Sequence, residues 1–154
     1  MTLRSQLGRF RAEILSAVHS RPLPLQNQGP VVSFCFDDFP RTAYTTGGAI
    51  LKSFGVYGTY YAALGLMNTT NELGDQLRQE DIDSLLADGH ELGCHTFSHV
   101  SSRTVSLRLF ERDVIKGRQA IRALTGWDAG NFAYPRGHVS IRHKTKIVAL
   151  MTSC

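Results

Sequence analysis

Short apolar runs alternate along the chain with segments whose apolar residues recur at helical spacing. The runs are rich in β-branched and aromatic residues, as strands are, and cover residues 31–36, 56–64, 90–94 and 131–135. The segments with apolar residues three or four positions apart predict helices over residues 44–54, 79–89, 107–125 and 140–150. Gly89 and Gly126 end two of these helices, which is a common use of glycine. Strands that alternate with helices indicate βαβ units, and hence an α/β fold with a mostly parallel sheet.

The first 30 residues have a different pattern from the rest of the chain. Residues 1–21 predict a short basic amphipathic helix, whose apolar positions are Leu3, Leu7, Phe10, Ile14 and Val18. Residues 20–30 (SRPLPLQNQGP) contain three prolines and predict a linker. We therefore divide the chain into an N-terminal amphipathic helix and linker, residues 1–30, and one domain, residues 31–154. The pattern favours packing of this helix on the edge of the domain over attachment to a membrane surface.

Composition and charge narrow the class of protein. The chain has 154 residues, of which 42% are hydrophobic and 19% charged, as expected for one globular domain. No apolar run approaches the roughly 20 residues of a membrane-spanning helix, and the N-terminus lacks the features of a secretory signal. The net charge of +4 is spread along the chain without interleaved aromatic residues, which argues against a nucleic-acid partner. Three cysteines without a CxxC pair favour a reducing compartment, so we expect a cytoplasmic protein.

Polar side chains follow each predicted strand. Asp37 and Asp38 come directly after the first strand, and residues 68–70 follow the second. Residues 95–99 follow the third strand, and residues 135–138 follow the fourth. Because ligands of parallel α/β proteins bind at the carboxyl ends of the strands, we expect these four segments to converge on one face of the domain.

Two adjacent carboxylates and two histidines on this face are candidate metal ligands. The spacing of His95 and His99 predicts two imidazoles on one face of a helical turn, as in several metal-dependent hydrolases. Each feature alone has an ordinary alternative: a solvated Asp-Asp turn, or histidines of the core or surface. Together, two imidazoles and one carboxylate make the ligand count of catalytic zinc, and the second carboxylate could accept a proton from water. Cys35 and Cys94 lie beside these residues, and strand alternation predicts that they are buried small hydrophobic residues.

Three sequence motifs carry a resemblance to a known family. FCFDDFP at 34–40, DGHELGCHTFSH at 88–99 and FAYPRG at 132–137 resemble the first three motifs of the polysaccharide deacetylases. This family is the NodB-homology domain, or carbohydrate esterase family 4. GVYGTYYAALGLMN at 55–68 is similar to the family's second strand, so the resemblance extends over most of residues 31–150.

The resemblance implies a fold, a site and a reaction. The fold would be a distorted (β/α) barrel with a divalent metal, usually zinc, at its C-terminal rim. Asp38, His95 and His99 match the family's metal ligands. Asp37 matches its catalytic base, and Arg136 occupies the position whose backbone N–H stabilises the oxyanion. The reaction would be the hydrolysis of acetyl groups, N-acetyl in preference to O-acetyl, on an acetylated oligosaccharide or polysaccharide.

This chain departs from the family pattern in its third motif and at its end. The family's R-x-P-Y-G reads here as AYPRG at 133–137, so the arginine that steadies the base is absent and Arg136 replaces the tyrosine. The chain ends at Cys154, before the fourth motif and before the fifth, which carries the family's histidine acid. We therefore expect a barrel that is incomplete at the C-terminus. Its exposed edges could be covered by a second copy of the chain in a homodimer.

These departures leave alternatives to an active deacetylase. A protein with a base and a metal but no acid would turn over slowly, or would be a non-catalytic glycan- or metal-binding remnant of the fold. His138 could replace the acid, although an ordinary surface histidine is favoured. A third, more distant interpretation is an adaptor that binds nucleic acid or a membrane through residues 1–21.

Overall fold

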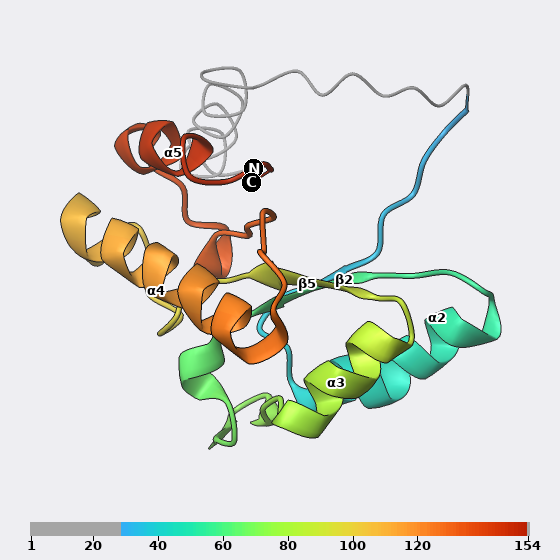
Figure 1. Cartoon of the computed structure of the whole chain (residues 1–154). Helices are drawn as coiled ribbons and strands as arrows, with labels where there is room; N and C mark the ends of the chain where they lie inside the picture. Colours follow the sequence, from blue (N-terminus) through green and yellow to red (C-terminus); the bar gives the residue numbers. More distant parts are fainter. Residues whose placement is uncertain (1–28, 154) are drawn as a thin grey trace, which may run out of the picture.

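A three-stranded parallel sheet forms the centre of the computed structural model, which describes residues 29–153 (Figure 1). The strands lie in the order β1-β2-β5, with the bounds Cys35–Phe36, Thr59–Ala62 and Glu91–Cys94. In the parallel register Cys35 lies opposite Thr59, and Ala62 lies opposite Cys94. The parallel α/β arrangement predicted from the sequence is thereby confirmed. The predicted N-terminal helix, most of the linker and Cys154 lie outside the described residues.

Beyond β5 the sheet continues only as isolated bridges. Phe132 pairs with Cys94, and Asn131 pairs with Ser153, both in the parallel sense. The predicted fourth strand over residues 131–135 is therefore wrong in its second half, where η3 (Pro135–Gly137) is a 3₁₀ turn. Pro135 has no N–H to donate to a neighbouring strand, and Arg136 has a left-handed backbone with φ of 62°. Within residues 29–153 the parallel sheet thus has three regular strands, and single bridged positions extend it beyond β5.

Four helical regions occupy the positions that the apolar spacing predicted. The first consists of a π-helix, η1 (Ala43–Gly48), continued by α2 (Ala49–Ser53), and the others are α3 (Gln79–Ala87), α4 (Leu107–Thr125) and α5 (Ile141–Val148). Gly89 and Gly126 follow α3 and α4 with φ of 85° and 73°, which confirms their role at the helix ends. Figure 1 shows α2 and α3 grouped together, apart from α4 and α5.

Shorter elements form the connection between β2 and α3. They are the 3₁₀ helix η2 (Leu64–Leu66) and an antiparallel pair, β3 (Thr70–Asn71) with β4 (Gly74–Asp75). Residues 68–70, which the sequence places after the second strand, lie at the start of this small hairpin. No helix within residues 29–153 has the length and hydropathy needed to cross a bilayer.

The core lies between the sheet and the helices, and the start of the first predicted strand lies outside it. Tyr60, Leu92 and Phe110 are fully or almost fully buried. The predicted strand over residues 31–36 is confirmed only at Cys35–Phe36, and Val31 and Val32 before it are 65% and 76% exposed. β1 is at the edge of the sheet. Just before it the carbonyl of Phe34 accepts a hydrogen bond from the N–H of Thr59 in β2, but the other side has no strand within the described residues. For the same reason Cys35 is exposed, contrary to prediction, whereas Cys94 in β5 is buried as predicted.

Candidate metal centre

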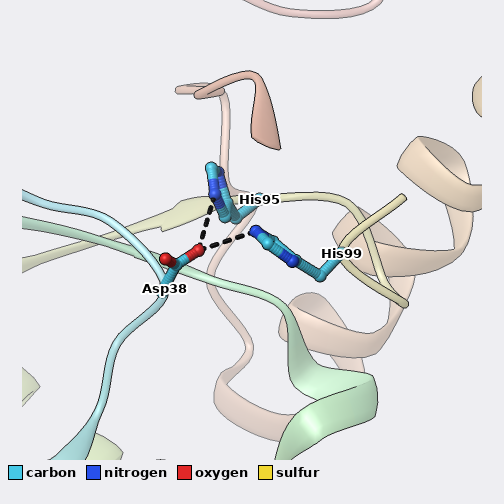
Figure 2. Close-up of side chains that lie close together, drawn as sticks. All are labelled: Asp38, His95 and His99. Carbon is cyan, nitrogen blue, oxygen red and sulfur yellow. Dashed lines mark ion pairs between the residues drawn. The ribbon is translucent and has the colours of Figure 1, made fainter. Parts of the chain in front are cut away.

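Two segments that are far apart in the sequence bring one carboxylate and two imidazoles together. Asp38 follows β1, and His95 follows β5 directly, with His99 four residues later. Figure 2 shows the three side chains pointing toward one another. Asp38 Oδ1 lies 2.7 Å from His99 Nε2 and 3.2 Å from His95 Nε2. One ligand atom from each residue lies within 4.8 Å of the other two, which is a spacing that a single metal ion can bridge.

The two histidines do not lie on a helical turn, so that part of the prediction is wrong. The chain from His95 to His99 is an irregular loop, in which Thr96 and His99 have left-handed φ values of 63° and 55°. The two rings nevertheless lie close, with centroids 5.2 Å apart. The side chain of Thr96 stabilises the loop, because its Oγ1 accepts a hydrogen bond from the N–H of Val100. The loop brings together two imidazoles that a helix was expected to align.

The three candidate ligand atoms are arranged as ligands of a divalent metal rather than as hydrogen-bond partners of one another. Asp38 Oδ1, His95 Nε2 and His99 Nε2 are buried and have no hydrogen-bond partner. A contact between the carboxylate and an imidazole is an ion pair only if the histidine is protonated, and buried unpaired polar atoms are rare in folded proteins. A metal ion would satisfy all three at once. Two nitrogens and one oxygen are a ligand set that zinc accepts with one position left open.

His95 is held in the form that a metal ligand needs. Its Nδ1 lies 2.9 Å from the carbonyl oxygen of Ala133 and can donate a hydrogen bond to it, which leaves Nε2 free of a proton. Burial lowers the pKa of His95, and the nearby carboxylates of Asp37 and Asp38 act against this shift. The imidazole is therefore neutral at neutral pH, and the neutral imidazole is the form that binds a metal.

Asp37 and Arg136, the predicted base and oxyanion donor, lie outside the three-atom cluster. Asp37 is exposed, and its charge acts on both His95 and the Tyr61 hydroxyl. Arg136 is exposed in η3, the turn that follows the Ala133 carbonyl bound by His95. The catalytic roles of Asp37 and Arg136 stay predictions.

Left-handed backbone conformations are concentrated in the three motifs. Residues other than glycine rarely adopt positive φ, and such strain persists where the surrounding structure holds it, often at functional sites. Within residues 29–153, all but one of the non-glycine residues with positive φ lie in a motif: Asp38, Phe39, Thr96, His99 and Arg136. The residues with positive φ therefore lie in the same motifs that supply the cluster of ligand atoms.

Two residues support the site in ways that the sequence does not indicate: His138, which the sequence suggests only as an acid or a surface histidine, and Asp113, which it does not single out. His138 is partly buried rather than an ordinary surface histidine: its Nδ1 lies 2.7 Å from Ser101 Oγ, and its carbonyl accepts a hydrogen bond from Ser102 Oγ. These contacts join the loop after β5 to the loop after residue 132. Asp113 in α4 accepts hydrogen bonds from Phe97 and Ser98. In the sequence Asp113 has only the signature of a polar position on a helix, so no local pattern identifies it.

The fold and the cluster define a parallel α/β protein with a candidate divalent-metal site at the carboxyl ends of its strands. The sequence model of the polysaccharide deacetylase family matches residues 25–151. That match covers most of the 154 residues, and the chain belongs to the polysaccharide deacetylase family. No curated protein sequence gives a significant match.

Solved structures with the same fold include several deacetylases. IcaB from Ammonifex degensii matches with a TM-score of 0.72 and 21% identity, over 94% of this chain and 71% of that one. The deacetylase PplD from Streptococcus pyogenes matches with a TM-score of 0.69 and 20% identity, over 90% of this chain and 59% of that one. For the chitin deacetylase of Colletotrichum lindemuthianum the TM-score is 0.68 and the identity 24%, over 84% and 57% of the two chains.

These matches confirm the fold class expected from the sequence, that of the polysaccharide deacetylases. Identities of 20% to 24% establish the fold alone. The chain also spans less than two thirds of the length of PplD and of the chitin deacetylase.

Proposed function

We propose that this protein is a metal-dependent carbohydrate deacetylase, which removes acetyl groups, in particular N-acetyl groups, from an oligosaccharide or polysaccharide. The proposal is carried by the cluster of three buried ligand atoms without hydrogen-bond partners, formed by residues of the family's motifs. Family membership supports the type of reaction. Two similar structures, the peptidoglycan deacetylase PdaC from Bacillus subtilis and the chitin deacetylase, support an acetylated glycan as the class of substrate.

Asp38, His95 and His99 would hold the metal, and zinc suits their two nitrogens and one oxygen. When bound, the metal supplies a Lewis acid for the acetyl carbonyl and lowers the pKa of a bound water to about 7. Ala133 contributes through its carbonyl, which fixes the tautomer of His95 and orients its ring.

The remaining chemistry falls to two residues outside the cluster. Asp37 is exposed beside the ligands and would accept the proton of the attacking water at its carboxylate. The backbone N–H of Arg136 would donate a hydrogen bond to the oxygen of the acetyl group as negative charge develops on it.

A second candidate function is binding of a metal and a glycan without turnover. The third motif favours it, because AYPRG at 133–137 lacks the arginine that steadies the base in the R-x-P-Y-G form. Asp37 has no hydrogen bond or salt bridge to any arginine within residues 29–153. Release of acetate, even if slow, would therefore support the deacetylase, and no release would support the binding protein.

The test combines metal analysis with measurement of acetate release. The protein is stripped with a chelator, reloaded with zinc, and incubated with N-acetylated chito-oligosaccharides. We expect one zinc per chain and release of acetate that the chelator abolishes. D38N should lose zinc binding, because the carboxylate is one of only three ligands in the cluster. D128N is the matched control, because Asp128 is an exposed carboxylate that pairs with Arg118.

Each result supports or contradicts one of the two functions. Zinc with acetate release supports the deacetylase. Zinc at full occupancy without acetate release, from this substrate and from other acetylated glycans, supports the binding protein. Failure of the wild type to bind zinc, or loss of zinc in D128N to the same degree as in D38N, contradicts the metal site on which both functions depend.

A further inference from the structure

One side chain of α4 makes several of the hydrogen bonds that hold the loop carrying the two histidines. Asp113 Oδ2 accepts hydrogen bonds from the N–H of Phe97, at 3.0 Å, and from the N–H of Ser98, at 2.8 Å. Asp113 Oδ1 accepts a third from the Ser98 hydroxyl, at 3.0 Å. Both carboxylate oxygens are thus directed at the two residues that precede His99. The backbone adds two more hydrogen bonds, because the N–H of Phe97 also lies 3.1 Å from the carbonyl oxygen of Asp113 and the N–H of Gly65 donates to the carbonyl of Phe97. Within residues 29–153 no lysine or arginine forms a salt bridge with Asp113, so its charge is available to the loop.

The loop needs such a partner because of its backbone. Thr96 and His99 both have left-handed φ values, and Phe97 and Ser98 lie between them. Two successive N–H groups in such a turn point to the same side, and a carboxylate is a strong acceptor for both. Asp113 therefore stabilises the segment whose conformation decides where the imidazole of His99 lies.

The two histidines among the candidate ligands differ in the contacts that fix their rings. The ring of His95 is fixed by its own contact with the Ala133 carbonyl, and its backbone N–H bonds to Ala62 of β2. The ring of His99 has no hydrogen bond at all to another residue within 29–153, although its Nε2 lies 2.7 Å from Asp38 Oδ1. The place of His99 is consequently set by the loop, and through the loop by Asp113.

Other contacts show that α4 packs directly against this loop. A Cβ at Gly117 would lie 2.8 Å from the carbonyl carbon and oxygen of Thr96, so the helix and the loop are in direct backbone contact. The Lys116 ammonium lies 3.7 Å from the centre of the Phe97 ring. Lys116 and Gly117 lie three and four residues after Asp113, so both are its neighbours on the surface of α4.

We infer that Asp113 is a positioning residue for the metal centre: its carboxylate, through the N–H groups of Phe97 and Ser98, holds His99 where Nε2 can share a metal ion with Asp38 and His95. The inference rests on the proposed metal site. It assigns no chemical step to Asp113, which touches neither the ligand atoms nor a substrate. It predicts instead that the affinity and the geometry of the bound metal depend on a residue in α4.

The experiment measures metal binding without reference to turnover. The zinc Kd of the full chain is determined by competition with a chromophoric chelator, and the cobalt(II) form is compared by its visible absorption spectrum. We expect D113A to weaken zinc binding by about 10- to 100-fold and to shift the cobalt spectrum, as loss of a residue that orients a metal ligand does. D128N removes an exposed carboxylate that pairs with the same helix, and we expect it to bind both metals as the wild type does.

D113N keeps the inference testable if D113A does not fold. The amide retains one acceptor oxygen for the two N–H groups but loses the charge, and hydrogen bonds to charged groups are the stronger ones. We expect a zinc Kd raised by about threefold or more, with metal-free stability close to that of the wild type. Wild-type affinity and cobalt spectrum in D113N, or equal weakening in D113A and D128N, would overturn the inference. Failure of the wild type to bind zinc would instead contradict the proposed function.

Discussion

Asp37 and Asp38 are neighbours in the chain, but their surroundings differ. Asp38 is partly buried, has a left-handed backbone with φ of 64°, and directs Oδ1 at two imidazole nitrogens. Asp37 is exposed and lies outside the cluster of candidate ligands. Both residues lie beyond the end of β1, so their different surroundings come from the turn rather than from strand alternation, and two adjacent carboxylates can have separate roles. This separation is the basis for treating one as a ligand and the other as a base.

The division of roles makes a prediction for Asp37. D37N should lower kcat on an acetylated chito-oligosaccharide by about 10²- to 10⁴-fold, because an amide cannot accept the proton of the attacking water. Its zinc content should equal that of the wild type. Acetate release and metal analysis on the same preparation check both parts. D83N is the control, since Asp83 is an exposed carboxylate of α3 whose side chain accepts a hydrogen bond from Gln79. Undiminished turnover in D37N would exclude Asp37 as the base.

At the scale of elements, α4 connects the core to the site. Its buried face includes Phe110, Val114 and Ile121, which belong to the hydrophobic core. The buried face also contacts the end of β5, where Cys94 Sγ lies 3.8 Å from the carbonyl oxygen of Val114, and the adjoining face contacts the loop after β5. A glycine at position 117 allows the close approach of the helix backbone to Thr96.

This contact predicts the effect of a methyl group at Gly117. G117A should lower the free energy of unfolding of the metal-free protein by about 1–3 kcal/mol, because the added Cβ meets backbone atoms that cannot move aside. The effect is opposite to the gain of about 1 kcal/mol that alanine brings to an exposed helix position. Urea unfolding measures the difference. Q119A, at an exposed position of the same helix, should change stability by less than about 0.5 kcal/mol. A stabilised G117A would show that the helix and the loop are not in contact.

At the scale of the whole molecule, three buried histidines make the fold sensitive to acid. Burial lowers the pKa of His90, His95 and His143, so each is disfavoured in its charged form when the protein is folded. His90 also uses Nδ1 as an acceptor for the N–H of Gly58, a bond that protonation at Nδ1 would abolish. The unfolded chain therefore binds more protons than the folded protein at pH values below about 6.5.

The sign of the pH dependence follows. The metal-free protein should be most stable above pH of about 6.5 and should lose stability as the pH falls below that value. Chemical unfolding at pH 7.5 and pH 5.5, in the presence of a chelator, measures the change. H143Q should show a shallower dependence than the wild type, because it removes one of the three titrating groups. Equal or greater stability at pH 5.5 would contradict the prediction.

The order of elements and the identity of the clustered residues could be predicted from the sequence. Apolar spacing located α3, α4 and α5 to within a few residues, and Gly89 and Gly126 ended two helices where expected. The resemblance of the motifs to the polysaccharide deacetylases implied Asp38, His95 and His99 as the metal ligands, and these three residues form the cluster. These features depend on interactions along one short segment, or on the rule that parallel strands end at one edge, so the sequence alone determines them.

Only the tertiary structure decided how the site is held and which apolar residues are covered. The helical turn predicted for the two histidines is a loop, because its conformation depends on Asp113, which lies 15 residues from Ser98. The partner of His95 is Ala133, 38 residues away. Residues 31–34 have an apolar pattern typical of a buried strand but are exposed, since burial depends on which segments pack against them. Contacts between distant segments have no periodicity in the sequence, and the geometry of the candidate metal centre is built from such contacts.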